Sequence, residues 1–93
     1  MISSFGDKET EKIWNGISIR NLPIEVQQQG RRKLRMLNNA QSLIDLRIPP
    51  SNRLEKLTGG LKKFFCIRIN NQWRVIFKWN YGQADEVKIV DYH

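Results

Sequence analysis

The sequence is poor in the side chains on which several protein classes depend. Its one cysteine, Cys66, can form neither an intrachain disulfide nor a cysteine-based metal cluster, and a buried structural thiol is expected. No stretch approaches the roughly 20 apolar residues that span a bilayer. The N-terminus lacks a basic segment leading into an apolar run, so we expect neither a membrane protein nor a secreted one, and place the chain in the cytoplasm.

Acidic side chains are also scarce beside basic ones. Sixteen Lys and Arg against nine Asp and Glu leave a formal net charge of +7. Such an excess attracts polyanions by long-range steering and by release of counterions from phosphates, which makes nucleic acid the leading class of partner. On charge alone, an acidic protein partner or a merely solvated basic surface remains open.

Large apolar side chains, by contrast, are present in sufficient number for a packed interior. The sequence is 40% hydrophobic and contains three Trp, four Phe and two Tyr. Its 93 residues have the size of one compact domain, so we predict a single domain over residues 1–93.

The first half of the chain predicts helices. Residues 2–5 are typical of a short edge strand, and Asp7 is a good N-cap for a helix that ends near Asn15. Pro23 suits the first turn of a longer helix that ends near Asn39. One stripe of this helix is predicted to pack on the core: Val26, Gly30, Leu34, Leu37 and then Gln41. The remaining surface is basic, through Arg31, Arg32, Lys33 and Arg35, and is either a solvated face or a phosphate-facing one.

The second half predicts strands. An apolar cluster of Leu43, Ile44, Leu46 and Ile48 ends at two prolines, and strand-like runs follow at residues 64–69, 73–79 and 86–92. Short linkers between the runs favour an antiparallel meander, so the fold class is α+β. If the alternating apolar residues pack on the helices, the opposite face of the sheet is cationic and carries Arg68, Arg74, Lys78, Lys88 and Tyr92. Ordinary alternation in a half-buried sheet would give the same pattern.

Four segments together resemble the HigB branch of the RelE/ParE toxin superfamily: MISSF, PPSNRLEKL, IRINNQWRVIFKW and IVDYH. The resemblance covers nearly the whole chain, and the NQWR segment and the DYH ending are its most distinctive parts. It implies a RelE-like fold, in which N-terminal helices pack on one face of a twisted, mostly antiparallel sheet whose concave face receives RNA. It further implies an endoribonuclease that cuts mRNA in the A site of the 70S ribosome, without metal or organic cofactor. The expected partner is a HigA-like helix-turn-helix antitoxin, through which the complex would bind operator DNA, and the toxin alone is expected to be monomeric.

The resemblance also assigns roles to residues. Arg74 matches the arginine of the family's W-R motif and would stabilise charge on the scissile phosphate. His93, the only histidine, matches the DYH ending and would donate a proton to the leaving oxygen. Tyr92 would stack on a base or orient the phosphate, and Asp91 would bind His93 or take part in proton transfer. Alternation places Tyr92 and Asp91 on opposite faces of a regular strand, so a terminal twist is needed to bring both to the site.

The sequence departs from the family at one position. Glu55 stands where some members have a histidine, which removes a two-histidine mechanism and leaves Glu55 as either a general base or a solvated strand residue. Six further residues are expected to contact RNA phosphates: Arg53, Lys56, Lys62, Lys63, Arg68 and Lys78. Two alternatives stay open, namely a ParE-like toxin that targets gyrase without nuclease activity, and a non-catalytic basic RNA-binding module.

Overall fold

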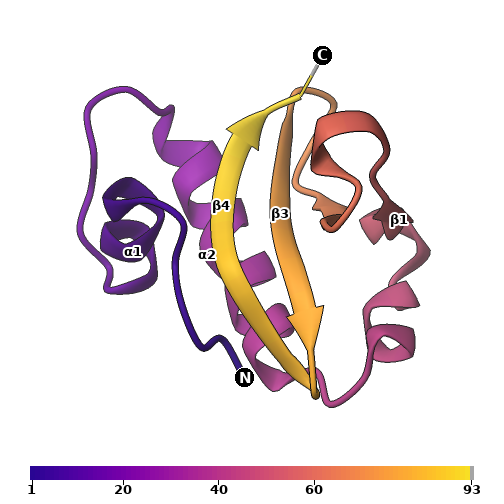
Figure 1. Ribbon diagram of the computed structural model, residues 1–93. Coiled ribbons are helices and arrows are strands. Elements are labelled where there is room, and N and C mark those ends of the chain that lie inside the picture. Colours follow the sequence, from indigo (N-terminus) through magenta and orange to yellow (C-terminus); the bar gives the residue numbers. More distant parts are fainter. Residues whose placement is uncertain (93) are drawn as a thin grey trace.

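The computed structural model describes residues 1–92, and it places two helices against one face of a four-stranded sheet. The elements are α1 (Lys8–Trp14), α2 (Ile24–Asn39), the short 3-10 helices η1 (Leu43–Arg47), η2 (Pro50–Asn52) and η3 (Gly59–Leu61), and the strands β1 (Glu55–Lys56), β2 (Phe65–Arg68), β3 (Trp73–Asn80) and β4 (Gln83–Asp91). All neighbouring strands are antiparallel, in the order β1-β2-β3-β4. Figure 1 shows α2 behind β3 and β4, with α1 beside β4. The predicted α+β fold is confirmed.

The helix α1 begins where the sequence predicts. Asp7 is its N-cap, and the Asp7 carboxylate accepts a hydrogen bond of 2.7 Å from the backbone N–H of Thr10. The Thr10 hydroxyl in turn accepts a bond of 2.9 Å from the backbone N–H of Ile89 in β4. A side chain in the first turn of α1 therefore ties that helix to the sheet.

The segment before α1 lies along the outer edge of β4, as its predicted edge-strand character implies. The backbone N–H of Ser3 donates to the carbonyl of Ala84 and that of Gly6 to the carbonyl of Val87, each at 2.8 Å. These contacts form two isolated parallel bridges and not a full strand. The edge of β4 is thereby partly covered.

The helix α2 carries the predicted apolar stripe. Four of its expected core positions are buried: Val26, Gly30, Leu34 and Leu37. A Cβ atom on Gly30 would lie 3.0 Å from the Cδ1 atom of Ile89, so glycine at this position lets the helix approach β4 closely. The prediction was wrong for Gln41, which is exposed because the helix ends at Asn39 and the chain turns away from the core.

The connection from α2 to β1 contains several apolar residues, but not all of them are buried. Of the predicted cluster, Leu46 is fully buried, whereas Ile44 and Ile48 are mostly exposed. The buried side-chain amide of Asn52 organises this region. It accepts a hydrogen bond of 2.6 Å from the Lys33 ammonium and donates one of 3.1 Å to the backbone carbonyl of Leu46. Partial burial lowers the pKa of Lys33. Asn52 thus holds η1 and η2 against α2.

Two apolar clusters lie on opposite faces of the sheet. The main core, between helices and sheet, contains Ile13, Leu34, Leu37, Leu46, Ile67, Val75, Phe77 and Val87. A smaller cluster on the other face contains Leu57, Cys66 and Ile76, with Phe64 and Val90 packed against it. The face predicted to be cationic therefore has an apolar centre, because Leu57 and Phe64 fold back over it. Within residues 1–92, no helix has the length and apolarity needed to cross a membrane.

Candidate active site

The face of the sheet away from the helices, here called the open face, carries two arginines side by side. Arg68 on β2 lies directly opposite Arg74 on β3, and Arg74 lies opposite Val90 on β4. Residues paired in this way point to the same face. Like charges directly opposite each other destabilise a sheet, and a bound anion would remove that repulsion. Two neighbouring guanidinium groups on one face are able to bind an anion such as a phosphate.

Arg74 is held in place by the turn between β2 and β3. Its Nη1 donates to the backbone carbonyl of Asn70, and also to that of Trp73 at 3.1 Å. Its guanidinium lies 5.3 Å from the centroid of the Tyr92 ring, a cation–π contact. Among residues 1–92, these bonds use only Nη1, which leaves the Nε and Nη2 donors for a ligand.

The same turn holds the second arginine and the end of the chain. The Nη2 atom of Arg68 donates to the Asn71 side-chain oxygen. The backbone carbonyl of Gln72 accepts a hydrogen bond of 2.7 Å from the backbone N–H of Tyr92. The side-chain amide of Gln72 donates a hydrogen bond of 3.0 Å to a carboxylate oxygen of Asp91. The turn residues 70–72 therefore organise Arg68, Arg74 and the last strand together.

The structure brings Tyr92 to Arg74 and keeps Asp91 at the turn. Asp91 pairs in register with Trp73, one position away from Arg74, so alternation directs its side chain away from the face that carries Arg74. Its carboxylate contacts Gln72, whereas the half-exposed Tyr92 ring reaches the open face. His93, the predicted proton donor, lies outside the described residues.

Glu55 joins the open face from the far edge of the sheet. It pairs with Cys66, which pairs with Ile76, so all three point to the open face one row below the two arginines. Burial raises the pKa of the Cys66 thiol, and the Glu55 carboxylate raises this pKa further. The Arg74 guanidinium and a hydrogen bond with the Glu55 backbone act in the opposite direction. Glu55 and Arg74 thus act on the same thiol, and the predicted buried, unreactive cysteine is confirmed in its burial.

The other predicted RNA contacts surround this centre unevenly. Lys56, Lys62 and Lys63 are exposed and line an open hollow of about 510 Å³ with Leu57, Thr58 and Gly59. Arg53 is exposed just before β1, in a left-handed conformation with φ of 47°. Lys78 is paired with Glu86 at 2.6 Å and lies 5.3 Å from the Phe64 ring centroid. Its charge is therefore already neutralised in part, unlike that of the three lysines.

Sequence interpretation missed the residues that position the arginines. Asn70, Asn71 and Gln72 were regarded as a linker, although they belong to the distinctive NQWR segment. The signal was the choice of two asparagines, whose side chains cap turns readily: the Asn70 side chain accepts 2.8 Å from the backbone N–H of both Gln72 and Trp73. Over residues 1–92, no three His, Cys, Asp or Glu side chains gather into a metal site.

Comparison with known proteins gives the family of this fold and site. The family model described as the RelE-like toxin of type II toxin-antitoxin system HigB matches residues 3–93. The chain belongs to the HigB-like toxin family. It is 42% identical over 85 residues to Toxin HigB-1 of Vibrio cholerae serotype O1, which covers 90% of each chain. It is also 38% identical over 56 residues to an uncharacterized protein of Haemophilus influenzae, covering 60% of this chain and 55% of that one.

This family membership confirms the resemblance predicted from the sequence. HigB-like toxins are generally ribonucleases, and a type II toxin is paired with a protein antitoxin. The helices against an antiparallel sheet agree with the fold of such toxins.

Proposed function

We propose that this HigB-like chain, as a single domain over residues 1–93, is a ribosome-dependent endoribonuclease that cleaves mRNA in the ribosomal A site. In this proposal it acts in the cytoplasm without a metal or organic cofactor, as a monomer until its antitoxin binds. That antitoxin is a HigA-like helix-turn-helix protein, and the complex binds operator DNA through it. Toxin HigB-1 of Vibrio cholerae, identical at 42% of aligned positions, supports the assignment.

The observation that carries the proposal is the placement of Arg74. Its guanidinium lies on the open face, fixed by two backbone carbonyls, beside Tyr92 and opposite Arg68. Cleavage of RNA without a metal needs a preorganised positive charge where the phosphate becomes more negative. A planar guanidinium held from one side, with donors left on the other, supplies this charge with little reorganisation.

The remaining roles follow from the reaction. A base removes the proton of the ribose 2′-OH, the 2′-oxygen bonds to phosphorus, and the P–O5′ bond breaks as the 5′-oxygen takes a proton. The products are a 2′,3′-cyclic phosphate and a 5′-hydroxyl end. Glu55 is our candidate base: its backbone is two strand spacings across and one row along the sheet, roughly 12 Å, from that of Arg74, which leaves room for a nucleotide between the side chains. His93 is the candidate proton donor, with Tyr92 orienting the phosphate and Asp91 assisting His93.

Primer extension on mRNA translated in a reconstituted system tests the proposal. The wild-type chain is expected to create new 5′ ends within ribosome-bound codons, and no cuts in the same mRNA without ribosomes. Arg74→Ala should lower the cleavage rate about 10²- to 10³-fold, as loss of a transition-state donor does elsewhere. Arg20→Ala is the matched control, since Arg20 is an exposed arginine in the linker between α1 and α2 and not on the open face, and should keep most of the activity.

Two other outcomes would favour the rival functions. Intact mRNA together with inhibited DNA supercoiling by gyrase would indicate a ParE-like toxin. Intact mRNA with ordinary salt-dependent binding to RNA, and no inhibition of either target, would indicate a non-catalytic RNA-binding module. Either result would contradict the nuclease.

A further inference from the structure

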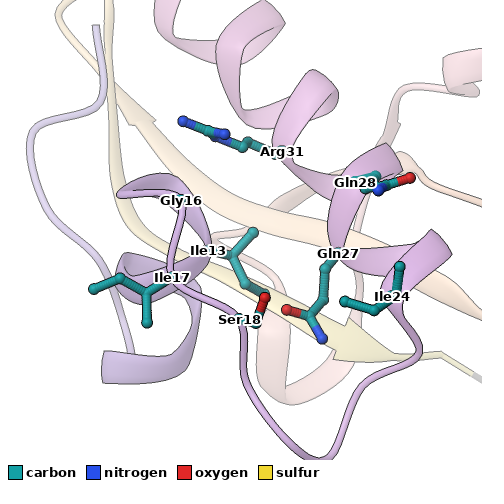
Figure 2. Close-up of a pocket in the computed structure, with 8 residues that line it drawn as sticks. All are labelled: Ile13, Gly16, Ile17, Ser18, Ile24, Gln27, Gln28 and Arg31. Carbon is teal, nitrogen blue, oxygen red and sulfur yellow. The ribbon is translucent and has the colours of Figure 1, made fainter.

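A groove lies in the helical layer, on the other side of the sheet from Arg74. It runs between α1, the linker that follows it, and α2, and its volume is about 120 Å³. Figure 2 shows Ile13 and Gln27 in its middle, with Ile17 and Ile24 at opposite ends. A cavity of about 150 Å³ holds a benzene ring in another protein, so this smaller groove has room for one small apolar side chain.

The walls of the groove are well fixed. Gln27 is buried, and its side chain bonds to the backbone of the linker at three points: it accepts from the N–H of Ile19 at 3.0 Å and donates to the carbonyls of Ile19 and Leu22 at 2.9 and 2.6 Å. The linker is thereby held on α2. The groove is a preformed feature and not a gap left by a loose loop.

Two isoleucines at its ends are exposed without a structural reason. Ile17 is 54% exposed and Ile24 is 56% exposed. A single exposed isoleucine is ordinary, but two at opposite ends of one groove, with Ile13 between them, offer apolar contacts along a groove whose other walls are polar. Such a surface favours a protein segment over RNA, which would place charged phosphates against it.

Arg31 adds a positive charge to the lining of the groove. Its guanidinium reaches over Gly16, as Figure 2 shows. A Cβ atom built on Gly16 would lie 3.2 Å from Nη2 of Arg31. Its Nε atom is buried and has no hydrogen-bond partner in the described structure. Within residues 1–92, the ion pair is that of Lys78 with Glu86, and Arg31 forms no ion pair with a carboxylate. Because Arg31 lines the groove, a carboxylate that enters it would meet the guanidinium and could form a charge-assisted hydrogen bond with it.

We propose that this groove, named here the α1–α2 groove, docks a segment of the antitoxin that carries an apolar side chain next to a carboxylate. The apolar side chain enters between Ile17 and Ile24, and the carboxylate pairs with Arg31. The net charge of +7 on this chain is complementary to an acidic segment. The inference rests on family membership in a toxin-antitoxin system, and it does not depend on the nuclease proposal.

Binding measurements on point variants test the groove. The probe is the purified helix-turn-helix protein encoded beside this chain's gene, titrated into the full chain by calorimetry. Ile17→Asp, Ile24→Asp and Arg31→Glu are each expected to lower its affinity by about 10-fold or more, as loss of a central contact does. The two isoleucine variants change exposed side chains and should fold normally, even if Arg31→Glu does not.

A matched control lies on the same helix. Arg35 is an exposed arginine of α2 outside the groove, and Arg35→Glu should change the affinity less than about 3-fold. Cleavage of mRNA on ribosomes by all four variants should stay within about 3-fold of wild type.

Three results would overturn the inference. The first is an unchanged affinity in both isoleucine variants, or no binding of the probe by the wild-type chain. The second is a fall in mRNA cleavage with unchanged antitoxin affinity, which would make the groove an RNA contact. The third is a wild-type dimer in sedimentation that these variants dissociate, which would make the occupant a second copy. A wild-type chain that binds the probe through the groove but cuts no mRNA would instead contradict the nuclease proposal alone.

Discussion

The two faces of the sheet use their polar side chains in opposite ways. On the face covered by the helices, buried polar groups such as Thr10, Gln27 and Asn52 join one element to another. On the open face, the cation Arg68 is held by the turn between β2 and β3, and Arg74 by that turn and the Tyr92 ring; within residues 1–92, the ion pair is that of Lys78 with Glu86 and involves neither arginine. The first arrangement stabilises the fold, whereas the second stores an unfavourable charge that a phosphate can relieve.

The stability of the fold and the proposed activity therefore depend on separate sets of residues. The main core reaches the open face only through the backbone of β2 and β3, where Phe77 and Ile67 point one way and Arg74 and Arg68 the other. Substitutions on one face should therefore change the free energy of unfolding, and substitutions on the other should change the cleavage rate.

The largest effect is expected from the core side chain Phe77. It is fully buried, with ring centroids of Phe65 and Trp79 at 6.2 and 6.3 Å. Phe77→Ala removes most of a buried ring and leaves a cavity, so the free energy of unfolding should fall by about 3–5 kcal/mol in urea titrations. The remaining folded molecules should still cleave mRNA at a near-normal rate.

Tyr81 offers the control for this prediction. Its side chain is fully exposed at the turn between β3 and β4, and Tyr81→Ala should change the free energy of unfolding by less than about 0.5 kcal/mol. The separation of the two faces would be contradicted if the Phe77 variant stayed folded but lost cleavage.

The second effect tests whether the planar guanidinium of Arg74 matters beyond its positive charge. Arg74→Lys keeps the charge but cannot both donate to the carbonyls of Asn70 and Trp73 and offer a planar fork to a phosphate. We expect the single-turnover cleavage rate on ribosomes to fall about 30- to 100-fold, while the free energy of unfolding changes by less than about 1 kcal/mol. Near-normal cleavage by this variant would mean that charge alone suffices and that the fixed fork is unimportant.

Much of the fold was accessible from local signals in the sequence. The N-cap Asp7, the helical stripe ending at Leu37 and the alternation around Val75 each depend on residues close in the chain. The two-residue strand β1 was not predicted as an element of the sheet, since Glu55–Lys56 is too short to show a period. The apolar centre of the open face was also missed, because it needs the fold-back of residues 57–64 onto Cys66.

The candidate site was predictable in its members more than in its connections. Arg74 and Tyr92 came from the family resemblance, but their contact depends on the register of β3 against β4, which no local pattern encodes. The register is interrupted by an irregularity between Ile76 and Lys78. The roles of Asn70 and Asn71 arise only when the turn closes and both arginines meet it.

The smallest effect, and the sharpest test of the turn, is expected at Asn71. Its side-chain oxygen accepts a hydrogen bond from Arg68, so Asn71→Ala frees that guanidinium without removing its charge. Loss of one exposed, charge-assisted hydrogen bond corresponds to about 1 kcal/mol, or roughly 5-fold in the cleavage rate at saturating ribosomes. Asn80→Ala is the control: Asn80 also bonds through its side chain at a turn, to Asp85 at 2.8 Å, but at the other end of β3. An equal fall in the cleavage rate of both variants would mean that any weakened turn slows the reaction. A fall in the Asn71 variant alone would mean that the position of the Arg68 guanidinium contributes to the reaction, since both variants keep the charge of Arg68.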